Sequence, residues 1–203
     1  MTEQLSTEKQ AVILDAARKR FAYYGFSKVT MDEIAADIGM GKTSLYYYFP
    51  TKESLFQEVI KQESNQFLDD IQSMINEKIP PCDMLRMYAA KRIEHFRNLA
   101  NLRALQFQQT AELRLPFLEL FKDFQKQEVS LLQQILVIGK QAGEFSLTSP
   151  EQSAEIIIMM LYGPRALYLH KRGNSLDDET YKVLEQSSKE IVEIILNGIR
   201  KRN

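Results

Sequence analysis

Helix breakers are scarce in this chain and occur in groups, and this spacing limits the fold more than any other feature of the sequence. The sequence holds 8 Gly and 6 Pro, so 14 of its 203 positions are strong breakers, against roughly 12% in average proteins. Between the groups, apolar residues recur three and four positions apart, which is the period of an amphipathic helix. The sequence therefore predicts nine helices, over residues 8–24, 30–39, 42–49, 51–77, 83–98, 102–112, 116–142, 150–171 and 177–200.

Several of these helices begin with a cap that can be read from the sequence. A Ser or Thr followed three residues later by Glu or Gln has the spacing of a capping box, and it occurs at Thr7, Thr30 and Ser149. Pro116 and Pro150 suit the first turn of a helix, where a missing N–H costs no hydrogen bond. Because the first three helices are short and the others long, we predict an all-α chain. Its N-terminal three-helix domain covers residues 1–52 and a larger six-helix domain covers residues 53–203.

Charge and cysteine content exclude several classes of protein. The formal net charge is -1; residues 1–52 hold seven Lys or Arg and six Asp or Glu, giving +1, and the other 19 basic and 21 acidic residues give -2. The single cysteine, Cys82, cannot form an intramolecular disulfide, and neither histidine has a partner at metal-ligand spacing. No metal and no cofactor are predicted. The most apolar stretch, Ile156 to Leu161, is far shorter than the roughly 20 residues of a membrane helix, so we expect a cytoplasmic protein without a membrane partner.

The two short helices on either side of Gly39-Met40-Gly41 carry the most functional information. A short Gly-containing turn between two helices is typical of a helix-turn-helix. In the second helix Leu45 and Phe49 point one way, whereas Thr43 and Tyr47 point the opposite way. An exposed row of Tyr and Thr is unfavourable unless a partner covers it, and hydroxyl groups and helix N-termini are groups that bind DNA phosphates. The pattern therefore favours DNA as the partner.

Residues 30–55 read TMDEIAADIGMGKTSLYYYFPTKESL, and this stretch resembles the DNA-binding signature of TetR/AcrR-type bacterial transcriptional regulators. The resemblance covers residues 8–60. It implies a ligand-responsive, sequence-specific DNA-binding regulator: a repressor that a small apolar or amphipathic effector releases from a palindromic operator. It also implies base contacts from the start of the second helix and phosphate contacts from its tyrosines and the following lysine. The DNA-binding residues implied in this way are Thr30, Lys42, Thr43, Ser44, Tyr46, Tyr47, Tyr48 and Lys52.

Two positions depart from the family pattern and leave alternatives open. Gly41 stands where a Ser or Thr often caps the recognition helix, so a side-chain cap is lost and N–H groups stay free. Asp32 either accepts a hydrogen bond from cytosine N4 or points away from DNA. Tyr48 is either a phosphate contact or a core residue. The alternative function from another class is a helical lipid-binding or protein-adaptor module that grips a partner with the tyrosine face.

The middle of the chain is rich in aromatic and Met side chains, which repack readily around apolar molecules. The resembled family keeps its effector pocket in this region. Arg165, next to the helix breaker Pro164, is a candidate for an anionic headgroup or an interface salt bridge, and Pro164 predicts a kink. The predicted effector pocket consists of Phe67, Met87, Tyr88, Phe96, Phe107, Phe121, Phe124, Met159, Tyr162 and Arg165.

The last two helices are predicted to form a homodimer. The first of them is apolar all round between Ile156 and Tyr162, which in a helix of a globular protein indicates burial on both sides. The resemblance implies a four-helix bundle with a second copy, and the alternative is an ordinary monomeric core. The predicted interface residues are Ile157, Leu161, Leu184, Ile191 and Ile195. No Ser, Cys or carboxylate group stands at a spacing that indicates catalysis, so the chain is not expected to be an enzyme.

Overall fold

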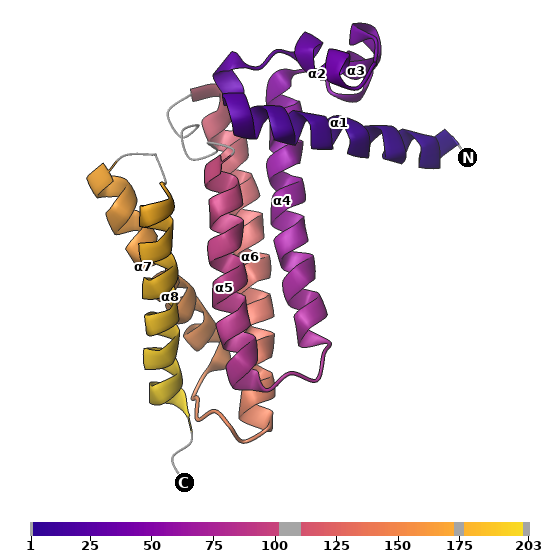
Figure 1. Cartoon of the computed structure of the whole chain (residues 1–203). Coiled ribbons are helices and arrows are strands. Elements are labelled where there is room, and N and C mark those ends of the chain that lie inside the picture. Colours follow the sequence, from indigo (N-terminus) through magenta and orange to yellow (C-terminus); the bar gives the residue numbers. More distant parts are fainter. Residues whose placement is uncertain (1, 102–110, 173–176, 201–203) are drawn as a thin grey trace. The chain divides into compact units, whose positions relative to one another are not determined.

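The computed structural model describes residues 2–101, 111–172 and 177–200, and Figure 1 shows that helices make up this part of the chain. No strand occurs among the described residues; Phe145 and Arg200 form one isolated bridge. The all-α prediction is confirmed. The elements are α1 (Thr2–Tyr24), the short 3-10 helix η1 (Phe26–Lys28), α2 (Met31–Asp37), α3 (Lys42–Tyr48), α4 (Lys52–Ile75), α5 (Pro81–Asn101), α6 (Ala111–Gln141), α7 (Pro150–Arg172) and α8 (Asp178–Ile199).

The chain forms two compact units. The first contains Met1–Glu63 and Asn98–Leu118, and the second contains Ser64–Arg97 and Glu119–Asn203. The sequence places the domain boundary after residue 52, near the start of α4, whereas the two units divide this helix between Glu63 and Ser64. Helix α5 likewise belongs to the second unit up to Arg97 and to the first unit from Asn98. The two units are therefore covalently joined through continuous helices.

The first unit is built around the apolar stripe of α1 and the start of α4. Its core includes Ile13, Ala17 and Phe21 of α1, and the ring of Phe21 packs edge-on against that of Phe56 at 4.9 Å between centroids. Helices α1 and α2 are in contact, as are α2 and α3. The apolar stripe of α1, which also includes Leu14, is buried in this core.

The second unit buries side chains from five helices in one core. Residues of α4, α5, α6, α7 and α8 contribute, among them Ile71, Leu85, Leu132, Ile158 and Leu196. Helices α7 and α8 run alongside each other (Figure 1). In the described part of the chain, no helix is both long enough and apolar enough to cross a membrane.

The cap predicted for α2 is present in the structure, and α4 has a side-chain cap as well. Thr30 and Glu33 form a complete capping box at the start of α2. The Thr51 Oγ1 accepts from the Ser54 backbone N–H at 3.0 Å at the start of α4. These bonds satisfy N–H groups that have no partner inside the helix.

The predicted start of the first helix was wrong. Helix α1 begins at Thr2, so Thr7 lies inside the helix and is not its N-cap. The capping-box spacing at Thr7 is compatible with a helix start but does not require one, because Thr and Gln are also tolerated in a helix interior.

The predicted break at Pro116 was also wrong, because α6 runs from Ala111 through Pro116 to Gln141. The helix predicted over 102–112 lies, apart from its last two residues, outside the described residues. Proline inside a helix costs about 3 kcal/mol, which burial along a 31-residue helix can outweigh. Helix α7 likewise continues through Pro164.

A glycine at the end of α6 makes room for the segment that follows. Gly143 has a φ of 75°, as expected for a C-terminal glycine, and the Glu144 N–H donates to the Gly139 carbonyl at 3.0 Å. The ring of Phe145 then folds back so closely over Gly139 that a Cβ there would lie less than 3.0 Å from three ring carbons. The Ser146 N–H donates to the Ile199 carbonyl at 2.7 Å and ties this segment to the end of α8.

Candidate nucleic-acid interface

The turn between α2 and α3 is set by two glycines. Gly39 has a φ of 62°, in the region that L-residues with a side chain rarely adopt, and the Met40 N–H donates to the Ala35 carbonyl at 2.9 Å. This is the geometry of a Schellman cap. Gly41 is the N-cap of α3 and makes no side-chain capping bond, as predicted. The first N–H groups of α3 therefore lack a side-chain acceptor from the N-cap.

Helix α3 has one buried and one exposed face. Leu45 is fully buried, and Phe49 is buried just after the helix ends. On the opposite face Tyr47 is 82% exposed, and Thr43 and Ser44 are exposed as well. The sequence prediction for the two faces of this helix is confirmed.

The other two tyrosines lie on the flanks of α3. Tyr46 is 38% exposed, whereas Tyr48 is half-buried and packs edge-on against the ring of Tyr47 at 5.4 Å between centroids. The two alternatives for Tyr48 are thus not exclusive: its ring supports Tyr47 while part of it stays accessible. An aromatic neighbour restricts the orientation of the Tyr47 ring and reduces the entropy lost on binding.

Lys42 and Asp32 form an ion pair across the turn. The Lys42 Nζ lies 2.8 Å from the Asp32 Oδ2, and both side chains are exposed. The Asp32 hydrogen bond raises the pKa of Lys42. The Lys42 ammonium also lies over the Tyr46 ring, 5.9 Å from its centroid. Asp32 is therefore the partner of the cation at the first residue of α3.

Lys52 has a structural role that sequence reasoning missed. Its Nζ donates to the carbonyls of Phe26 and Val29, at 3.0 Å each, and lies 4.3 Å from the centroid of the Phe26 ring. These contacts use two of the three ammonium donors and join the start of α4 to the segment that precedes α2. Only the tertiary contacts indicate this role, because the spacing of the motif residues gives no sign of it.

Thr30 also has internal partners. Its Oγ1 lies 2.8 Å from the Glu33 Oε2, and its backbone N–H donates to the same oxygen at 2.8 Å. This backbone donor lowers the pKa of Glu33, with a smaller effect from the Thr30 hydroxyl. Thr30 therefore fixes the start of α2.

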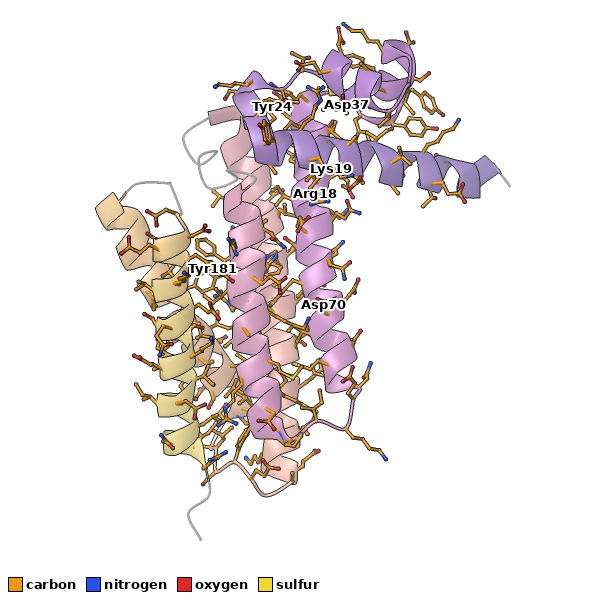
Figure 2. The ribbon with its side chains drawn as sticks, in the orientation of Figure 1. Arg18, Lys19, Tyr24, Asp37, Asp70 and Tyr181 are labelled. Carbon is orange, nitrogen blue, oxygen red and sulfur yellow. The ribbon has the colours of Figure 1, made fainter. Side chains whose placement is uncertain are left out.

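A salt bridge braces α1 against α2. Arg20 pairs with both carboxylate oxygens of Asp37, with a distance of 2.7 Å from Nη2 to Oδ1. The Arg20 hydrogen bond lowers the pKa of Asp37. Arg20 also lies over the ring of Tyr24, and Figure 2 shows Tyr24 and Asp37 near each other at the ends of α1 and α2. The bidentate pair fixes the orientation of the helix-turn-helix on α1.

A crevice of about 550 Å³ runs beside the recognition helix, and Lys9 of α1 lines it. The other lining residues include the turn glycines together with Thr43, Ser44 and Tyr47. Sequence reasoning did not single out Lys9, because it lies more than thirty positions away from α3 and outside the motif. Its position adds a cation to a crevice that is otherwise lined by hydroxyl-bearing side chains, the turn glycines and the apolar side chains of Ile38 and Met40.

The comparisons with known proteins agree with this geometry. The family model for bacterial regulatory proteins of the tetR family matches residues 13–59. The fatty acid metabolism regulator protein of Bacillus subtilis is 30% identical over 139 residues, which cover 67% of this chain and 70% of that protein. The chain belongs to the TetR family. It is a ligand-responsive, DNA-binding transcriptional regulator.

The similarity of this TetR-family chain extends beyond the helix-turn-helix. The crystal structure of a transcriptional regulator from Cytophaga hutchinsonii matches with a TM-score of 0.88 and 38% identity, covering 95% of this chain and 99% of that one. The transcriptional regulator RutR of Escherichia coli K12 is 26% identical over 202 residues, covering 96% and 92% of the two chains. The helices of the second unit therefore belong to the family fold as well.

The residues predicted for the effector pocket differ in their burial. Phe67, Tyr88, Phe96 and Phe124 are buried in the core, whereas Met159 is 65% exposed. Phe121 and Tyr162 are half-buried and Met87 is exposed. Phe107 and Arg165 lie outside the residues whose side chains are described. Aromatic content alone could not separate packing from pocket, because both use the same residue types.

A buried charged cluster lies among these aromatic residues. The Arg92 Nε lies 2.6 Å from the Glu128 Oε1, and the Tyr88 hydroxyl donates to the same oxygen at 2.8 Å. The Arg92 guanidinium stacks on the ring of Tyr162 at 4.0 Å. Burial, reinforced by the charge of Glu128, raises the pKa of Tyr88 well above its ordinary value, so its hydroxyl keeps its proton. The cluster joins α5, α6 and α7.

The predicted dimer residues are mostly part of the core of the single chain. Ile157, Leu161, Leu184 and Ile195 are buried in the chain itself, and Ile191 is half-buried. The periodicity of an all-apolar helix cannot tell which of its two faces packs internally. The apolar side chains that α7 and α8 expose are different ones: Ile156, Met159, Met160, Val183 and Ile194.

Proposed function

We propose that this regulator is a repressor that binds a palindromic operator as a homodimer and is released from it by an apolar or amphipathic effector. The observation that carries the proposal is the exposed face of α3. A ring as large as that of Tyr47 stands 82% exposed on a rigid, capped helix-turn-helix. Such a side chain offers both a hydroxyl group and an apolar ring to a base edge in the major groove.

We assign base contacts to the exposed residues at the start and on the outer face of α3, and phosphate contacts to its flanks. Base contacts come from Lys42, Thr43, Ser44 and Tyr47. Phosphate contacts come from Thr30, Tyr46, Tyr48 and Lys52. Lys9 adds a further phosphate contact, because it lines the same crevice. With two phosphate-contacting lysines in each subunit and four in a dimer, the logarithm of the affinity falls with the logarithm of salt concentration with a slope of about -4.

Fluorescence anisotropy with an operator selected from random duplexes tests this assignment. Tyr47→Ala is expected to weaken binding about 10- to 100-fold, which corresponds to about 1–3 kcal/mol for a lost base contact. Tyr47→Phe keeps the ring and removes the hydroxyl group, so it measures the contribution of the hydroxyl group to operator affinity. Tyr23→Ala is the matched control, since Tyr23 is as exposed but lies on α1. Unchanged operator affinity of Tyr47→Ala refutes the base contact, and operator binding that does not weaken with salt refutes the phosphate contacts.

The homodimer is proposed to form through the exposed apolar side chains of α7 and α8. Five such side chains on two adjacent helices leave an apolar surface that association covers. Ile194 is 65% exposed, so Ile194→Asp leaves the core intact and places a charge in the interface. We expect sedimentation equilibrium to show a dimer for the wild type and a monomer for this variant. A dimer that survives the substitution places the interface elsewhere.

The effector class is supported by the aromatic and Met-rich second unit and by the relative in Bacillus subtilis, whose name connects it to fatty acid metabolism. Release follows only if the effector binds the DNA-free conformation more tightly than the DNA-bound one. Continuity of α4 and α5 through both units offers a mechanical route for that coupling.

A further inference from the structure

A groove of about 430 Å³ lies between α5 and α8 in the second unit. This volume is in the range of small-molecule sites, roughly 300–1,000 Å³. Its wall on α5 includes Met87, Ala90 and Ile93, and its wall on α8 includes Ser188 and Val192. Of the residues predicted for the effector pocket, Met87 lines this groove, which is separate from the buried cluster around Arg92.

Charged contacts hold α5 and α8 together at two points. Arg86 binds Glu193 with both Nε and Nη2, at 2.6 and 3.1 Å. Toward the other end of α5, Arg97 pairs with Asp178 at 2.8 Å and stacks on Tyr181 at 4.3 Å. Figure 2 shows Tyr181 on the side of α8 that faces α5. The two arginines stand eleven positions apart, about 16 Å along the helix. The groove lies beside this stretch of α5, where small side chains such as Ala89, Ala90 and Ser188 are part of its lining.

One buried polar atom in the groove lacks a hydrogen-bond partner. Ser188 is buried, and its Oγ makes no hydrogen bond in the described part of the chain. A buried hydroxyl without a partner is unfavourable by about 1–3 kcal/mol. A helical serine can satisfy itself by bonding to the carbonyl one turn earlier, and Ser188 does not. Because Ser188 lines the groove, its hydroxyl is the polar group that lies next to a molecule that enters there and lacks a partner of its own.

The charges along the groove cancel. Its lining contains two cations, Arg86 and Lys189, and two carboxylates, Glu185 and Glu193. Each cation is already paired, Lys189 with Glu185 at 2.6 Å and Arg86 with Glu193. A charged ligand therefore meets no unpaired charge of opposite sign in this lining, and an uncharged ligand needs none.

We propose that this α5–α8 groove is the effector site and binds an uncharged amphipathic molecule, whose polar group hydrogen-bonds to the Ser188 Oγ while its apolar body covers Met87, Ile93 and Val192. The proposal rests on the proposed regulatory function. Coupling to DNA runs through α5, because this helix lines the groove and continues into the first unit at Asn98. A ligand that alters the packing of α5 therefore acts on a helix that both units share.

Calorimetric titration of the full-length protein with 1-octanol tests the site, with octanoate as the charged counterpart of similar length. We expect 1-octanol to bind more tightly than octanoate. Ser188→Ala weakens 1-octanol binding about three- to tenfold, the effect of one hydrogen bond. Ala90→Phe fills the groove and abolishes binding; Ala90 is exposed, so the larger side chain does not disturb the core. Ser187→Ala is the matched control, because Ser187 neighbours Ser188 but does not line the groove.

A second measurement separates a ligand role of Ser188 from a merely structural one. Ser188→Ala removes a buried, unsatisfied hydroxyl. Without ligand, the Ser188→Ala variant should therefore unfold at a higher urea concentration than the Ser187→Ala variant. A structural role predicts the opposite change. Higher stability together with weaker 1-octanol binding supports the proposal.

Three results overturn the proposal. They are 1-octanol binding that Ala90→Phe leaves unchanged, tighter binding of octanoate than of 1-octanol, and operator affinity that saturating 1-octanol does not alter. Operator binding of the wild type without ligand is measured in parallel. If this binding is absent while 1-octanol still binds in the groove, the repressor function fails and the ligand site stands. If the operator is bound but 1-octanol is not, the effector site fails and the repressor function stands.

Discussion

Removing the negative charge of Glu128 should destabilise the second unit more than any exposed charge change. Glu128 is fully buried, and only 7% of the Arg92 side chain is exposed. Glu128→Gln keeps the shape of the side chain but leaves the Arg92 guanidinium buried without its counter-charge. Breaking a buried pair in this way costs about 3–5 kcal/mol. Coulomb's law gives a similar figure, about 4 kcal/mol for unit charges 4 Å apart at an effective dielectric constant of about 20.

The assay is urea unfolding of the full-length protein followed by circular dichroism. We expect Glu128→Gln and Arg92→Met each to lower the free energy of unfolding by about 3–5 kcal/mol. The double variant Arg92→Met/Glu128→Leu should lose far less than the sum of the losses of Arg92→Met and Glu128→Leu measured singly, because an apolar pair needs no counter-charge. Glu58→Gln is the matched control, since its ion pair with Lys61 is exposed and contributes about 0.5 kcal/mol or less. A loss below about 1 kcal/mol for Glu128→Gln, or additive single losses, would refute the reasoning.

Three further perturbations probe other parts of the chain. Gly139→Ala places a Cβ against the ring of Phe145 and should lower the free energy of unfolding by about 1–3 kcal/mol. Gly198→Ala, which has open space around its Cβ, should raise it by up to about 1 kcal/mol. Equal urea midpoints of the two variants contradict this expectation. Lys52→Met should lower the thermal midpoint of the free protein as well as operator affinity, because two carbonyls lose their donor; a change in affinity alone assigns Lys52 to DNA only. The lowered pKa of Asp37 stabilises the fold above about pH 4, so the stability difference between wild type and Asp37→Asn should vanish as the pH falls from 5 to 2, and a constant difference in urea midpoints contradicts the pairing.

Local patterns predicted the helix-turn-helix well because its geometry is determined locally. The capping box at Thr30, the positive φ at Gly39 and the buried face around Leu45 each depend on residues within a few positions of one another. Spacing along a helix fixes which side chains share a face. The exposure of Tyr47 followed from that rule alone.

Contacts between distant residues could not be predicted in the same way. Glu128 pairs with Arg92 across 36 positions, and Lys52 reaches a carbonyl 26 positions earlier. The residues that flank Glu128 and Lys52 in the sequence are of the kinds that flank exposed charged residues. The local sequence therefore gives no sign of either contact. The dimer residues were hard to choose for a related reason: in a helix that is apolar all round, such as the stretch after Ile156, periodicity does not indicate which face packs inside the chain.

The pairing of its cations explains how a first unit with nearly balanced charge can serve as the DNA-binding unit under the proposed function. Arg20 and Lys42 are each held by a carboxylate, and Lys52 by backbone carbonyls. Redirecting such a cation to phosphate costs the contact it already has, which limits the gain from each lysine. The hydroxyl group of Tyr47 gives up no counter-charge on binding DNA. Affinity therefore depends on neutral donors held in fixed positions, and two copies in a dimer are needed to bring enough of them to one operator.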